Sequence, residues 1–166
     1  MFDKEYKKVI NIPMSVIIGS AIIIIITTGM TDPNAVKGLI GGYIGLLIGL
    51  LFIIIINYPT PNWLDMIPFI VVLCIISLLI FYLSKYFDKI STGEVSSYYQ
   101  TFSVLSAIFL GAQLIMLMSS TIDNSKETAG KLLSDKTFAL LGLLGVINFL
   151  IVITIGIVLN FYSTQG

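Results

Sequence analysis

The sequence has no arginine, no histidine and only one cysteine. Without histidine, the commonest metal ligand and general base is missing. The lone Cys74 lies inside an apolar run, where it can form no intrachain disulfide and belongs to no metal-ligand spacing. No phosphate-binding loop and no pair of carboxylates at a helical spacing is present either. We therefore expect no catalytic residue, no cofactor site and no metal site, and expect that the protein is not an enzyme.

Charge is also scarce, because only 11% of the residues are charged, against roughly a quarter in a soluble domain. Nine lysines balance nine acidic residues, so the formal net charge is zero. A protein that binds nucleic acid needs a basic surface, and this composition supplies none. We expect no nucleic-acid partner.

What the sequence does have is long apolar runs, with 57% hydrophobic residues and a mean hydropathy of +1.01. A helix needs about 20 apolar residues to cross a bilayer, and the runs do not alternate as barrel strands would. They predict a single all-α transmembrane domain over residues 1–166, a bundle of five transmembrane helices in a lipid bilayer. The expected spans are 12–30, 36–57, 64–83, 101–121 and 138–161.

Helix-capping residues precede several of these runs. We expect Pro68 to tilt or kink the entry of the third helix. The expected helix starts are at Asn11, Asp32, Asn62 and Ser134-Asp135.

Lysines are distributed unevenly between the two predicted membrane sides. The side of the N-terminus and the connections 58–63 and 122–137 holds six lysines, and the other side holds three. Because cytoplasmic segments carry the excess of basic residues, this pattern predicts a cytoplasmic N-terminus for an integral, multi-pass protein.

Small residues repeat every four positions in two of the predicted spans. Gly41, Gly45 and Gly49 do so in the second span, and Ser103, Ala107 and Gly111 in the fourth. Such stripes let helix backbones approach closely within lipid. They predict a glycine zipper in which the first, second and fourth spans form the tight centre of the bundle, or a contact with a second subunit in a homo- or hetero-oligomer.

Polar side chains within the spans are few, and no ionisable residue lies beyond the span ends. Gln113 and Asn148 lie near mid-span, where an unpaired amide is costly. We expect them to bond across helices, with a ligand site as the alternative. Asp65, at the entrance of the third span, is expected to be a first-turn charge favoured by the helix dipole.

Two connections are long enough to meet other proteins, at 84–100 and 122–137. In the first, Lys85, Asp88 and Lys89 flank aromatic residues and are interpreted as solvated or headgroup-facing residues, or as a protein docking surface. In the second, a short surface helix capped at Asn124 or Ser125 is expected.

The C-terminal part, less than half of the chain, resembles small membrane proteins of large double-stranded DNA viruses of algae and protists. Three segments carry the resemblance, YYQTFSVLS at 98–106, LLGLLGVINF at 140–149 and NFYSTQG at 160–166. The family pattern ends in an aromatic-Ser-Thr-acidic-Gly tail, and this chain has Gln165 at the acidic position. The resemblance implies a component of the internal membrane of a virion, in contact with capsid proteins.

The sequence therefore predicts a non-enzymatic structural membrane protein that packs with capsid or other membrane proteins. Two alternatives stay open at this point. One is an accessory subunit of a bacterial or organellar membrane complex, and the other is a small transporter or channel.

Overall fold

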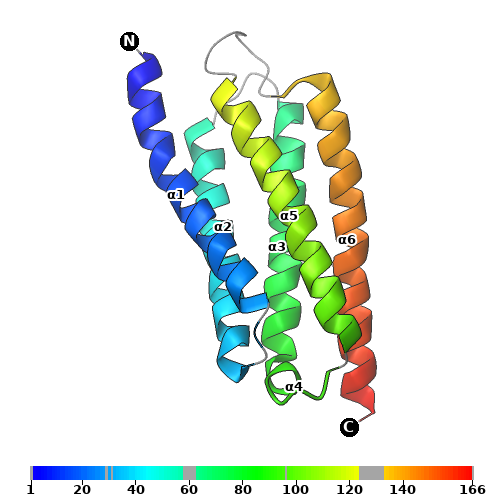
Figure 1. Cartoon of the computed structure of the whole chain (residues 1–166). Coiled ribbons are helices and arrows are strands. Elements are labelled where there is room, and N and C mark those ends of the chain that lie inside the picture. Colours follow the sequence, from blue (N-terminus) through cyan, green and yellow to red (C-terminus); the bar gives the residue numbers. More distant parts are fainter. Residues whose placement is uncertain are drawn as a thin grey trace.

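The computed structural model describes residues 2–28, 30, 32–57, 63–95, 97–123 and 133–165 (Figure 1). All regular structure in these ranges is helical. The elements are α1 (Phe2–Thr28), α2 (Pro33–Asn57), the 3-10 turn η1 (Trp63–Met66), α3 (Ile67–Lys85), α4 (Phe87–Ser91), α5 (Ser97–Asp123) and α6 (Asp135–Thr164).

Five of these helices are long and apolar enough to cross a membrane, which confirms the predicted fold class. The candidate spans are Asn11–Thr28, Asn34–Ile56, Trp63–Lys85, Ser97–Ser120 and Asp135–Thr164. An odd number of crossings puts the two ends of the chain at opposite ends of the bundle, as Figure 1 shows.

Two of the expected helix starts are found where the capping residues predict them. The side chain of Asp32 accepts a hydrogen bond from the backbone N–H of Asn34 at 3.0 Å, and α2 begins at Pro33. Ser134 is the N-cap of α6, and its hydroxyl oxygen accepts from the N–H of Thr137 at 3.3 Å.

The expected start at Asn11 is wrong, because α1 already begins at Phe2 and contains Pro13. The lysine and glutamate residues before Asn11 are good helix formers, so the helix extends beyond its apolar part. Pro68 lies in the first turn of α3, directly after η1. At that position a helix does not need the missing N–H, so the proline serves the helix start.

The connection 84–100 contains a helix that the sequence reading missed, the five-residue α4. Side chains of this corner bond to the last turns of α6. The hydroxyl of Tyr86 donates to Asn160 Oδ1 at 3.2 Å, and Lys89 Nζ donates to the carbonyl of Tyr162 at 3.2 Å. The corner ends at Gly93, whose φ of 74° favours glycine. The surface helix expected at Asn124 or Ser125 lies outside the described residues.

Contacts run from α1 to α2, α2 to α3, α3 to α6, α6 to α5 and α5 back to α1, which closes the bundle. α3 supplies a dense buried stripe to its core. The stripe is Phe69, Val72, Ile75, Ile76, Leu79 and Leu83. The predicted tight centre of the first, second and fourth spans is therefore wrong in part. α1 contacts both α2 and α5, but α2 packs on α1 and α3 and makes no comparable contact with α5.

Candidate functional site

The most extensive helix contact is between α1 and α2, and glycines of α2 make it possible. A Cβ on Gly42 would lie 2.6 Å from Ile24 Cγ1, and one on Gly49 would lie 2.6 Å from Ile17 Cγ1 and 3.2 Å from the carbonyl oxygen of Pro13. A Cβ on Gly45 would overlap the side chain of Ser20. The absence of these side chains lets the backbones approach.

Two of the three glycines of the four-residue repeat take part in this contact. Gly45 and Gly49 face α1, but Gly41 is exposed, with no neighbour within 4 Å of its Cβ position. Each four-residue step turns about 40° around a helix of 3.6 residues per turn. Gly41 and Gly49 therefore point in directions about 80° apart. The contact line instead takes Gly38, Gly42, Gly45 and Gly49, with steps of four, three and four.

The same correction applies to α5. Ser103 is buried and Ala107 is half-buried against the core, but Gly111 has no neighbour within 4 Å of its Cβ position. The buried line of this helix again alternates steps of four and three, as in left-handed helix bundles. It consists of Tyr99, Ser103, Ser106, Leu110, Gln113 and Leu117.

A polar network joins α5 to α6 within this line. Ser106 Oγ donates to Asn148 Oδ1 at 2.8 Å, and Asn148 Nδ2 donates to Gln113 Oε1 at 3.3 Å. Gln113 is 1% exposed, and both Ser106 and Asn148 are 0% exposed. The amide of Asn148 accepts from one α5 residue and donates to the other. The structure thus brings together the two residues singled out from the sequence, and adds Ser106 as a third.

One end of this network is open, because Gln113 Nε2 has no hydrogen-bond partner in the structure. It faces Gly145 of α6, where a Cβ would lie 3.3 Å from Nε2 and 3.2 Å from Val71 Cγ1 of α3. Gly145 therefore provides the space for the amide at the junction of α3, α5 and α6.

Two further polar residues within the spans bond to their own helices. The hydroxyls of Ser77 and Thr154 donate to carbonyls four residues earlier, at 2.8 and 2.9 Å. Such bonds satisfy the hydroxyl locally and join no second helix.

A contact that the sequence reading missed joins α3 to α6. The ring of Tyr82 occupies the position that a Cβ on Gly156 would take. Gly156 was not singled out from the sequence. The signal was the spacing of Leu141, Gly145, Asn148, Val152, Ile155 and Leu159, which places Gly156 beside the buried face.

At the α4 end of the bundle, the charged residues mostly serve the fold. Lys85 Nζ lies 5.3 Å from the centre of the Tyr86 ring, and Lys89, besides its bond to Tyr162, is 4.0 Å from the carboxylate of Glu94. Asp88 is exposed. At the opposite end of α3, Asp65 lies buried in η1 and not in the first turn of the α-helix. Within the described residues, no three metal-ligating side chains gather into one group.

No protein-family model, curated protein or solved structure matches the chain. The fold itself defines the class. This is an all-α protein whose five long apolar helices are those of an integral, multi-pass membrane protein.

Proposed function

We propose that the protein is a non-enzymatic structural component of a membrane, which packs with protein partners and holds them at the bilayer. The observation that carries the proposal is the bond between Asn148 and Gln113. These mid-span amides are the groups best placed to line a path or bind a ligand, and instead they join two helices.

The transporter alternative requires polar groups that face a path. Gln113 and Asn148 are buried against each other, and Thr154 bonds to its own helix. The charged residues of the described candidate spans lie near the span ends, as with Lys37, Asp65 and Lys85. In transporters, intramembrane ionisable groups mark proton and ion routes. This arrangement supports the structural role.

We further propose that this role lies in the internal membrane of a virion, with capsid proteins as partners, which is what the resemblance of the C-terminal part implies. A cytoplasmic N-terminus and contacts through the connections 84–100 and 122–137 belong to the same proposal. The accessory-subunit alternative differs only in the partner.

The partner can be identified by mild detergent extraction of the source membrane, affinity purification of the chain and quantitative mass spectrometry. A fixed stoichiometry with a capsid protein is the expected result. Fixed stoichiometry with respiratory or photosynthetic subunits would replace the viral setting with the accessory-subunit one. The chain alone, with no partner in any fixed ratio, would contradict a scaffold role.

A flux measurement tests the transporter class directly. The purified chain is reconstituted into liposomes loaded with ions and small polar solutes, next to protein-free liposomes. We expect equal leak rates. Solute flux that depends on the chain and that changes in an Asn148→Ala variant would contradict the structural proposal.

A further inference from the structure

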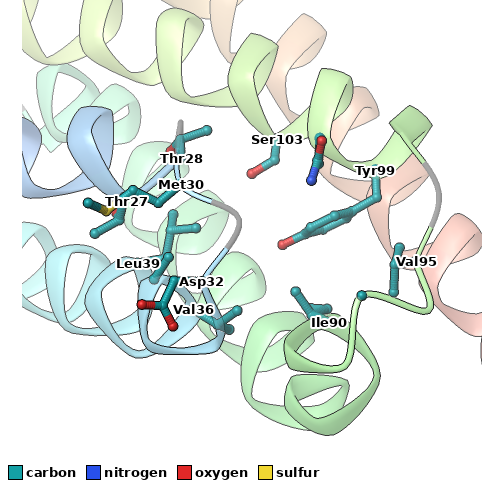
Figure 2. Close-up of a pocket in the computed structure, with 13 residues that line it drawn as sticks. Thr27, Thr28, Met30, Asp32, Val36, Leu39, Ile90, Val95, Tyr99 and Ser103 are labelled. Atoms are coloured by element: carbon teal, nitrogen blue, oxygen red, sulfur yellow. The ribbon is translucent and has the colours of Figure 1, made fainter.

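A cavity of about 270 Å³ lies where the end of α1, the start of α2, the α4 corner and the first turns of α5 meet (Figure 2). It is at the end of the bundle that carries α4 and the C-terminus (Figure 1). Charged residues of that corner, such as Asp88 and Glu94, are exposed. The cavity therefore lies at the depth where lipid headgroups meet a helix bundle.

Two polar side chains that line the cavity are buried. Tyr99 is 5% exposed and Ser103 is 4% exposed, and the hydroxyls of the two residues interact with each other. Figure 2 shows both hydroxyls directed into the space between α5 and the end of α1. Each hydroxyl oxygen keeps lone pairs that can accept a hydrogen bond from a ligand, and such a bond is stronger in a site away from water than at the surface.

The rest of the polar lining offers acceptors. The hydroxyls of Thr27 and Thr28 donate to carbonyls of their own helix, at 2.7 and 2.6 Å. Toward the cavity these hydroxyls can therefore only accept hydrogen bonds. The two threonines form the last turn of α1. Asp32 adds a carboxylate, and no lysine is among the described residues that line the cavity.

We propose that this cavity binds the primary ammonium group of an amphipathic or small soluble amine, with ethanolamine as the simplest example. The ammonium donates to the Asp32 carboxylate and to the oxygens of Tyr99 and the threonines, and the Tyr99 ring adds a cation–π surface. Val36, Leu39 and Ile90 provide apolar walls for the carbon atoms of the ligand. The inference does not depend on the proposed structural role, because a scaffold and a transporter could both carry such a site.

Three synthetic lipids with the same acyl chains test the proposal. They are phosphatidylethanolamine, its dimethylated form and phosphatidylcholine, which differ in the number of N–H donors. The full chain in neutral detergent is titrated with each lipid, and bound lipid is measured by native mass spectrometry. Phosphatidylethanolamine is expected to bind about tenfold more tightly than phosphatidylcholine, with the dimethylated lipid between them.

Two conservative variants assign the effect to this cavity. Asp32→Asn removes the charge but keeps an oxygen that can cap α2, and Tyr99→Phe removes only the hydroxyl. Each is expected to weaken phosphatidylethanolamine binding by roughly five- to tenfold. Asp88→Asn, which removes an exposed carboxylate on α4 outside the lining, is the matched control and is expected to bind like the wild type. Circular dichroism and thermal unfolding check that all three variants fold.

Competition with free ethanolamine then separates the two sources of the ammonium group. Displacement of the lipid at millimolar ethanolamine indicates a site for a soluble amine, and no displacement indicates a lipid site. Equal binding of phosphatidylethanolamine and phosphatidylcholine, or unchanged binding in both Asp32→Asn and Tyr99→Phe, would overturn the proposal.

Discussion

Ser20 of α1 and Gly45 of α2 lie so close that the serine side chain occupies the position of a Cβ on the glycine. Ser20 is itself buried. Membrane helices lack a hydrophobic drive toward each other, so a close approach of this kind supplies the dispersion energy that holds them together. The α1–α2 pair is thus stabilised chiefly by close packing of the two helix surfaces.

Replacement of Gly45 with leucine should separate this pair. The new side chain cannot fit beside Ser20, and overpacking of this kind costs about 1–3 kcal/mol. The free energy of unfolding, measured by titration with sodium dodecyl sulfate in mixed micelles, is expected to fall by that amount.

Gly41→Leu is the control for this prediction, because Gly41 is on the same helix and is exposed. The same substitution there is expected to leave stability unchanged or to raise it by up to about 1 kcal/mol through helix propensity. Similar losses at both positions would show that the α1–α2 contact is not the one described.

A methyl group at Gly156 should disturb the contact between α3 and α6. It would meet the ring of Tyr82, which can move only by leaving its place beside the core. Gly156→Ala is expected to lower the free energy of unfolding by about 1–3 kcal/mol. At the exposed Gly142 of the same helix, where a Cβ meets nothing, Gly142→Ala should stabilise slightly. If Gly156→Ala proves more stable than Gly142→Ala, Tyr82 does not pack on Gly156.

Removal of a tyrosine hydroxyl should change the stability of the protein in opposite directions at two positions. The hydroxyl of Tyr43 is fully buried and has no hydrogen-bond partner, so Tyr43→Phe is expected to leave stability unchanged or to raise it by about 1 kcal/mol. Tyr86→Phe removes the bond to Asn160 and is expected to cost about 0.5–1.5 kcal/mol. Thermal unfolding midpoints of both variants check this. A clear loss at Tyr43 would point to a partner for its hydroxyl.

The five spans could be read from the sequence because length and hydropathy alone determine them. Caps at Asp32 and Ser134 were predictable for a similar reason, since each acts on neighbouring residues. The start of α1 was not, because its first turns are polar and the apolar signal begins only near Asn11.

Which face of each helix is buried was predicted less well. A repeat of four suggested Gly41, Gly45 and Gly49, but helices that pack over a long distance need an average step near 3.5, which selects Gly38, Gly42, Gly45 and Gly49. That Gln113 and Asn148 bond across helices followed from the cost of burying an unpaired amide, but that they bond to each other did not. The role of Ser106 did not, because a serine can bond to its own helix and its partner depends on how α5 faces α6.

The place of Tyr82 and the α4 corner also depend on tertiary contacts. Tyr82 packs on Gly156, and Tyr86 and Lys89 bond to the end of α6, more than 70 residues away in the chain. The local sequence around these residues is rich in aromatic residues and lysine. It does not distinguish side chains that pack on another helix from side chains that face the lipid headgroups.

The central claim is that the mid-span amides join helices, and a double-mutant cycle between Gln113 and Asn148 tests it most directly. Stability is measured for Gln113→Ala, Asn148→Ala and the double variant, with Thr154→Ala replacing Asn148→Ala in a control cycle. We predict a coupling of about 0.5–1.5 kcal/mol for Gln113 and Asn148, and none for Gln113 and Thr154. Zero coupling in the first cycle would contradict the account, because the two amides would then be free to serve a path or a ligand.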